Sequence, residues 1–119
     1  MSESPAYVPA QGDVVWVDLD PRTGREQSGH RPALVLSQRD FAAVTGYAFV
    51  APITSRVRGW PFEVVLPDGL PVSGAVLVDQ SRSIDIQARH LRYACGSSQA
   101  VLAEALGKLQ AIVSTERQT

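Results

Sequence analysis

The chain has 119 residues, of which 45% are hydrophobic and 19% charged, and its formal net charge is −1. This length supports one core, so we expect a single domain over residues 1–119, and no apolar run is long enough for a membrane-spanning helix. The near-neutral charge argues against a protein that coats nucleic acid through overall basicity.

Five short segments rich in β-branched and aromatic residues predict strands, separated by turns that contain Gly and Pro. They are residues 14–19, 33–37, 47–52, 62–66 and 75–79. A short helix is predicted over residues 39–46. We expect residues 81–90 to be irregular, and a further strand over residues 90–95.

The C-terminal segment differs in pattern, because its apolar residues recur at helical spacing from Ser98 onward and form one stripe, with Glu104 and Lys108 off it. The stripe consists of Val101, Leu102, Ala105, Leu106, Leu109, Ile112 and Val113. The predicted fold is therefore mainly β with α, a compact barrel or sandwich on which a C-terminal helix packs.

The N-terminus and the single cysteine both favour the cytoplasm. Residues 1–13 lack the basic start and the apolar stretch of a secretion signal, and we expect no membrane partner. Cys95 has no second cysteine with which to form a disulfide or a metal site, which agrees with a reducing compartment. We expect Cys95 to be a small apolar packing residue.

The connection between the first two predicted strands, residues 20–30, is longer than a usual hairpin loop and rich in polar residues. Long loops in compact domains are often functional, although a solvated connector remains the alternative. Pro32 restricts Arg31 to an extended backbone, which would hold its guanidinium at the strand entrance for a fixed contact. A structural salt bridge from Arg31 to Glu26 is the competing explanation.

Positive charge is concentrated between Arg22 and Arg58, where six arginines accompany two acidic residues, a local excess of six minus two, or +4. Among the 11 basic residues of the chain only Lys108 is a lysine. Arginine suits bidentate phosphate contacts better than lysine does, although genomic codon bias would also explain the excess.

Three blocks of the sequence resemble the MazF/PemK family of toxin endoribonucleases. The first is GDVVWVDLDPRTGREQSGHRPALVLS (12–37), the second is VAPITSRVRGWPFEVVL (50–66) and the third is GAVLVDQSRSIDIQA (74–88). The resemblance implies an SH3-like β-barrel of the CcdB/PemK toxin type with a C-terminal α-helix. It also implies a homodimer that cleaves single-stranded RNA (mRNA) at a short recognition sequence without a metal or another cofactor. A cognate antitoxin is expected to neutralise this activity.

The family motif carries over to three candidate catalytic residues. RNA supplies its own nucleophile, the 2′-hydroxyl, so the enzyme needs a base, groups that stabilise the charge on the phosphorane, and a proton for the leaving 5′-oxygen. The expected ends are a 2′,3′-cyclic phosphate and a 5′-hydroxyl. The resemblance assigns Glu26 as base, Arg31 as charge stabiliser and possible proton donor, and Thr54 as hydroxyl donor, with Ser55 a weaker candidate. A guanidinium hardly deprotonates, so charge stabilisation is the role we favour for Arg31.

Further RNA contacts are expected from arginines and an aromatic side chain, because unpaired bases are read by stacking and edge hydrogen bonds. The candidates are Arg25, His30, Arg56, Arg58, Trp60, Gln80, Ser83 and Arg89. Trp60 could instead belong to the core. Because neighbours on a strand point to opposite faces, we do not expect His30 and Arg31 to share one phosphate, and we discount a catalytic pair with His90. We expect Asp79 and Asp85 to hold loops together, and Trp16 to pack in the core or at a subunit interface.

Two other functions remain open from the sequence. The first is a toxin of the same fold that poisons DNA gyrase, although the C-terminus lacks the tryptophan that those relatives carry. The second is a non-catalytic binding module. The sequence contains no cluster of His, Asp and Glu residues at the spacing of metal ligands, so it does not predict a metal site.

Overall fold

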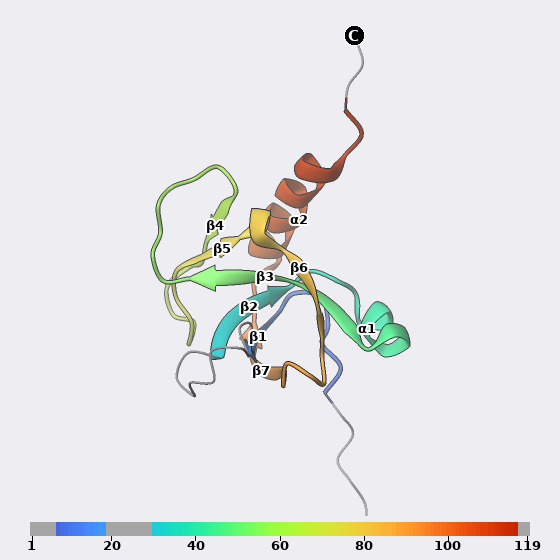
Figure 1. Ribbon diagram of the computed structural model, residues 1–119. Coiled ribbons are helices and arrows are strands. Elements are labelled where there is room, and N and C mark those ends of the chain that lie inside the picture. Colours follow the sequence, from blue (N-terminus) through green and yellow to red (C-terminus); the bar gives the residue numbers. More distant parts are fainter. Residues whose placement is uncertain (1–6, 19–29, 117–119) are drawn as a thin grey trace, which may run out of the picture.

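The computed structural model describes residues 7–18 and 30–116 and consists of one antiparallel sheet, two α-helices and a short 3₁₀ helix (Figure 1). The strands are β1 (Asp13–Asp18), β2 (His30–Val35), β3 (Tyr47–Thr54), β4 (Glu63–Val65), β5 (Ala75–Leu77), β6 (Arg82–Asp85) and β7 (Arg92–Gly96). The helices are α1 (Arg39–Thr45), the 3₁₀ helix η2 (Val78–Gln80) and α2 (Gln99–Val113). The prediction of a mainly β fold with a C-terminal helix is confirmed.

The sheet is organised around β3, its longest strand at eight residues. The pairing order is β4-β5-β3-β2-β1-β7, and β6 also pairs with β3. β5 pairs with Ile53 and Thr54, whereas β6 pairs with residues 47–50, and η2 connects these two partners. Among the described residues the pairing path ends at β4 and β7, so hydrogen bonds do not close the sheet into a complete barrel.

The structure corrects the sequence prediction in two places. Residues 82–85 were expected to be irregular but form β6. Only Ile84 among them is apolar, and the strand forms because all four residues pair with β3. The strand predicted over residues 75–79 ends at Leu77, where the backbone turns into η2.

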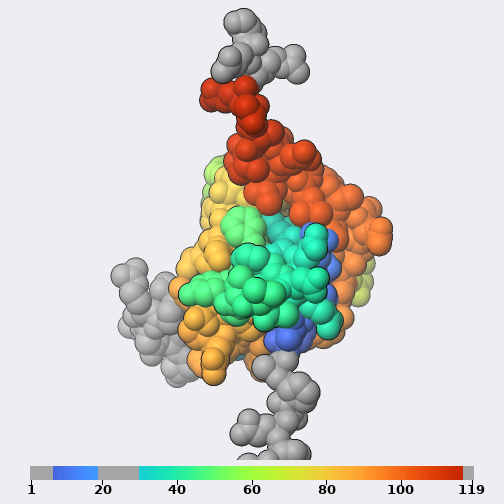
Figure 2. All heavy atoms as spheres, turned by 90° about the vertical axis from the view of Figure 1, so that its right-hand side faces the viewer, coloured from blue at the N-terminus to red at the C-terminus, as the bar shows by residue number. Residues whose placement is uncertain are grey.

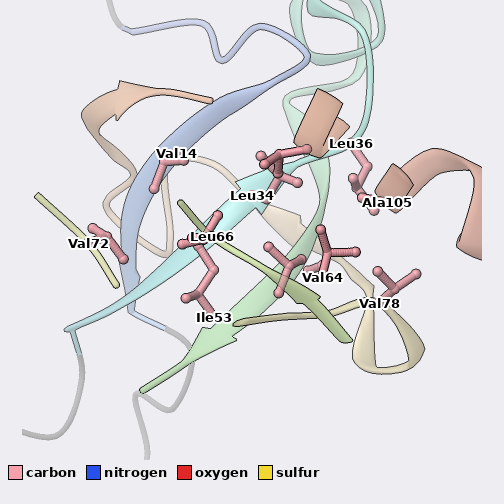
Figure 3. Close-up of a cluster of buried hydrophobic side chains, with 12 residues drawn as sticks. Val14, Leu34, Leu36, Ile53, Val64, Leu66, Val72, Val78 and Ala105 are labelled. Atoms are coloured by element: carbon pink, nitrogen blue, oxygen red, sulfur yellow. The ribbon is translucent and has the colours of Figure 1, made fainter. Parts of the chain in front are cut away.

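Alternation along the strands creates two buried clusters, one on each face of the sheet. The first cluster includes Val14, Leu34 and Ile53, and α2 covers it with Val101 and Ala105 (Figure 3). The second includes Val15, Val50 and Ile84, with Tyr7 and Ile86 packed against it. Burial of each large aliphatic side chain contributes about 1.5–3 kcal/mol, so the two clusters hold the sheet from both sides.

α2 is fixed at its start by a side-chain cap and along its length by one lysine. The Ser98 hydroxyl accepts a hydrogen bond from the Val101 N–H at 3.2 Å, and Lys108 Nζ donates to the Glu63 carbonyl at 2.8 Å. Within residues 7–18 and 30–116, no helix has the length and apolar character needed to cross a bilayer.

We expect Ser98→Ala to lower the free energy of unfolding by about 1 kcal/mol, because it leaves one N–H of the first turn of α2 without its acceptor. Ser98→Asn should retain most of the stability, since asparagine also caps helices. Urea denaturation of the three proteins measures this difference. Equal losses in both variants would show that the cap does not hold the helix.

Candidate functional site

Three strand ends meet at one edge of the sheet. β1 ends where β2 begins, with Asp18 paired to His30 and Val17 to Arg31. β2 pairs with β3 up to Ala33 and Pro52, and the same register continued by two residues places Arg31 opposite Thr54. Opposite positions on neighbouring antiparallel strands share a face. The two candidate catalytic residues that the structure describes therefore belong to one face at one edge.

The alternation along β2 also separates the two basic residues at its start. Arg31 shares its face with Ala33 and Val35, whereas His30 shares the opposite face with Leu34. Both His30 and Arg31 are exposed. Of the other candidates in this region, Glu26 and Arg25 lie outside the described residues.

A pocket of about 170 Å³ lies between the end of β3, the loop of residues 55–62, β4 and η2. Its lining residues are Thr54, Arg56, Arg58, Trp60, Glu63, Leu77 and Gln80, and we call it the arginine–tryptophan pocket. Five of these seven residues were candidates from the sequence, and the fold brings them together from two separate segments, residues 54–60 and Gln80. Glu63 and Leu77 were not predicted.

The arginine–tryptophan pair gives the pocket an aromatic surface and a cation. The Arg58 guanidinium carbon lies 5.1 Å from the centre of the Trp60 ring, within the range of a cation–π interaction. Trp60 is 51% exposed. The alternative that Trp60 belongs to the core is therefore wrong, and its ring is accessible to a planar ligand.

Thr54 is held at the rim of the pocket by close backbone packing. Its Oγ1 accepts a hydrogen bond from the Arg56 N–H at 3.1 Å, so the hydroxyl hydrogen is not used in that bond. Gly74 lies against the Thr54 carbonyl, because a Cβ built on Gly74 would be 1.9 Å from that oxygen. With a φ of +122°, Gly74 also has a backbone conformation that favours glycine.

Glu63 is the one charged residue that is buried among the described residues, with 5% exposure. Its Oε1 accepts hydrogen bonds from the N–H groups of Arg58 at 3.1 Å and Gly59 at 2.9 Å, and its Oε2 lies 3.3 Å from the Arg58 nitrogen. A glutamate at the start of a short strand has no sequence signal that separates it from a solvated residue. Only the fold shows that its carboxylate faces the loop.

The other described candidates do not line the pocket; they are His30, Arg31, Ser55, Ser83 and Arg89. Ser55 is exposed next to Thr54, and Ser83 is exposed on β6, where it pairs with Phe49. Arg89 donates from Nη1 to the Asp18 carbonyl at 3.1 Å, and the Asp18 N–H donates to the Arg89 carbonyl at 3.0 Å. Arg89 therefore joins the turn before β7 to the end of β1, beside the start of β2.

Other sequence interpretations concern residues away from the pocket. Asp85 Oδ1 accepts the Ala88 N–H at 3.0 Å, so Asp85 holds a turn as expected, whereas Asp79 is exposed in η2. Trp16 is half-buried and packs against the first cluster, in agreement with a packing role.

The groups with shifted pKa values also lie outside the pocket. Burial raises the pKa of the Cys95 thiol, and Cys95 packs against the first cluster, as a small apolar residue would. Burial, followed by the hydrogen bond that its hydroxyl donates to Asp13, raises the pKa of Tyr7 far above its ordinary value. Tyr7 therefore remains a neutral hydrogen-bond donor.

A larger cavity of about 610 Å³ lies near the other end of β3, between α1 and the turn before β7. α1 occupies the centre of the face shown in Figure 2, and in Figure 1 it lies on the side of the molecule opposite β4 and β5. The described lining includes Asp85 and His90 but no arginine or lysine. The smaller pocket is the better candidate site for an anionic ligand, because it carries two guanidinium groups. Nowhere in residues 7–18 and 30–116 do three His, Cys, Asp or Glu side chains form a group that could hold a metal ion.

Comparisons with known proteins identify similar chains. A sequence model of one protein family, described as PemK-like, MazF-like toxin of type II toxin-antitoxin system, matches residues 10–113. The chain is 49% identical over 83 residues to the endoribonuclease toxin MazF of Escherichia coli (strain K12), covering 70% of this chain and 74% of that protein. It is 35% identical over 108 residues to the endoribonuclease PemK of Escherichia coli, covering 87% and 81% of the two chains. The crystal structure of a MazE-MazF complex from Deinococcus radiodurans superposes with a TM-score of 0.83 and 41% identity, over 93% of this chain and 100% of that chain.

Proposed function

This chain belongs to the PemK-like, MazF-like toxin family of type II toxin–antitoxin systems, and on that premise we propose that it is an endoribonuclease toxin. Its substrate is single-stranded RNA, which it cuts at a short recognition sequence. The observation that carries the proposal is the pocket lined by Thr54, Arg58 and Trp60. It adjoins the end of β3 whose pairing with β2 stops at Ala33 and Pro52, two residues from Arg31. The same residues came from the sequence blocks that resemble the family.

The proposed chemistry is an internal transesterification. The 2′-oxygen attacks the adjacent phosphorus, its proton passes to Glu26, and the bond from phosphorus to the 5′-oxygen breaks. The products are a 2′,3′-cyclic phosphate and a 5′-hydroxyl, because the leaving 5′-oxygen takes a proton from water. Arg31 and the Thr54 hydroxyl stabilise the charge that develops on the phosphoryl oxygens, a role that needs fixed donors rather than a metal or another cofactor.

The RNA on either side of the cleaved phosphate is bound by the arginine–tryptophan pocket. Arg56 and Arg58 neutralise phosphates, and the Trp60 ring stacks on an unpaired base. Gln80 carries an amide that can pair with a base edge. Weaker contacts along the RNA strand are proposed for the remaining candidates, which are His30, Ser55, Ser83, Arg25 and Arg89.

We further propose that a cognate antitoxin silences the enzyme by covering the same surface. The Deinococcus radiodurans relative is crystallised with MazE, and an endoribonuclease from a mycobacterial species with its cognate antitoxin. An acidic or amphipathic antitoxin segment would pair with the exposed arginines and cover Trp60. The toxin acts in the cytoplasm as a homodimer, for which the exposed apolar side chains of Val65, Ile112 and Val113 offer surface.

Incubation of the purified protein with a long single-stranded RNA in EDTA tests this function. We expect discrete cuts whose upstream fragments end in a 2′,3′-cyclic phosphate and whose downstream fragments begin with a 5′-hydroxyl, as shown by end-specific labelling. The same RNA hybridised to a complementary strand should stay uncut, and sedimentation should give the mass of a dimer. Intact single-stranded RNA in the presence of folded protein would refute the nuclease and favour gyrase poisoning or simple binding.

A further inference from the structure

We propose that Glu63 is a positioning residue that shapes the RNA-binding loop without touching RNA itself. This inference rests on the proposed function, since the loop of residues 55–62 carries Arg56, Arg58 and Trp60. In the folded chain the Glu63 carboxylate holds the backbone of this loop in the shape that presents Arg58 and Trp60 to RNA.

The hydrogen bonds of Glu63 fold the loop back onto β4. The carboxylate accepts from the N–H groups of Arg58 and Gly59, and the Glu63 N–H donates to the Trp60 carbonyl at 3.1 Å. Every residue from Arg58 to Trp60 is therefore bonded to Glu63 through its backbone. Because the carboxylate binds only main-chain groups in these contacts, the Arg58 side chain is left to lie over the Trp60 ring.

Burial of Glu63 explains why a carboxylate serves this purpose. A charge that is 5% exposed must be compensated by donors, and backbone N–H groups are strong donors to a carboxylate. Such charge-assisted bonds are about twice as strong as neutral ones, so they hold an otherwise exposed loop in one conformation. With Oε1 already accepting two hydrogen bonds, Glu63 is poorly placed to act as a base toward RNA.

Glu63 is itself held in place by the surrounding fold. β4 pairs Glu63 with Leu77 of β5, and Lys108 of α2 donates to the Glu63 carbonyl at 2.8 Å. Lys108 also forms an ion pair with Glu104 at 3.1 Å, on the exposed side of the helix. Glu63 therefore connects the loop of residues 55–62 to both the sheet and α2.

Glu63→Gln tests the inference, because the amide keeps the size of the side chain but replaces one acceptor oxygen with a donor group. We expect KM for a short RNA substrate to rise about 10-fold, the scale of one lost base–aromatic stacking contact, with kcat within about 3-fold of wild type. Glu116→Gln, at an exposed glutamate beyond the end of α2, is the matched control and should leave both constants unchanged. In a Trp60→Ala background, Glu63→Gln should raise KM no further, since the two changes remove the same contact.

Trp60 fluorescence gives a readout that does not depend on cleavage. In a Trp16→Phe background, which leaves Trp60 as the sole tryptophan, Glu63→Gln should increase acrylamide quenching and lower the anisotropy of Trp60, whereas Glu116→Gln should not. If the wild-type protein failed to cut RNA, this measurement would still decide whether Glu63 positions the loop. Unchanged fluorescence and KM would overturn the inference, and so would a fall in kcat with a shifted pH profile at constant KM, because that result would assign Glu63 a chemical role.

Gly59→Ala keeps the test valid should Glu63→Gln fail to fold. Gly59 has a φ of +78°, and a Cβ built there meets nothing within 4 Å, so alanine strains only the loop conformation that the Glu63 carboxylate stabilises. We expect the same rise in KM and the same change in Trp60 quenching. Wild-type values of both KM and quenching would contradict the inference that the conformation of this loop determines RNA binding.

Discussion

Replacement of Arg31 with alanine should slow single-turnover cleavage of saturating RNA by about 10²–10³-fold, the usual cost of removing one preorganised donor from a developing oxyanion. Arg31 pairs with Val17 of β1, and the register of β2 with β3, continued two residues beyond the last pair of Ala33 and Pro52, brings it opposite Thr54. Pro32 restricts its backbone, so little reorganisation is needed when charge develops on the phosphate. The measurement is the rate of cutting of an end-labelled RNA in EDTA with enzyme in excess.

Arg92→Ala is the matched control for this change, because Arg92 is also an exposed strand arginine but lies on β7, on the other side of β1. Its rate should stay within about 3-fold of wild type, as expected for the loss of one peripheral charge. Arg31→Lys should restore only part of the rate, since an ammonium lacks the planar fork that fits a phosphate. If Arg31→Ala and Arg92→Ala cut RNA equally fast, Arg31 would not be a catalytic residue.

The sequence predicted those parts of the fold in which local pattern and burial agree. The apolar run before Asp18 forms β1, and the helical stripe faces the core in α2 from Val101 to Leu109. The last two residues of the predicted stripe, Ile112 and Val113, are exposed. β6 was missed because a segment with Ile84 as its only apolar residue carries no strand signal of its own. Its conformation comes from the free edge of β3, which is a tertiary contact and cannot be read from local composition.

The candidate site was predictable to the extent that it resembled a known family. Thr54, Arg56 and Trp60 were named from one sequence block, and the structure places all three around one pocket. Glu63 stands in the same block but was missed, since its importance depends on burial and on bonds to backbone groups. Residues that can bind a ligand are therefore easier to predict from sequence patterns than residues that hold the backbone of the site in place.

Gly74→Ala is expected to be the most destabilising of the substitutions considered, lowering the free energy of unfolding by about 3 kcal/mol or more. A Cβ at Gly74 would lie 1.9 Å from the Thr54 carbonyl oxygen and 2.8 Å from its carbon, and both are backbone atoms that no rotamer change can move. The left-handed φ of +122° adds a penalty of about 1–2 kcal/mol for any residue with a Cβ, on top of about 1–3 kcal/mol for overpacking. Urea denaturation measures the loss.

Gly69→Ala separates these two causes, because Gly69 has a similar φ of +97° but nothing lies within 4 Å of its Cβ position. We expect it to lose only the conformational part, about 1–2 kcal/mol. Since Gly74 packs on Thr54 at the rim of the pocket, the folded fraction of Gly74→Ala should also cut RNA more slowly than wild type, whereas Gly69→Ala should not. Equal stability of the two variants would mean that β3 can move away from Gly74 at little cost, and Thr54 would then not depend on this contact for its position.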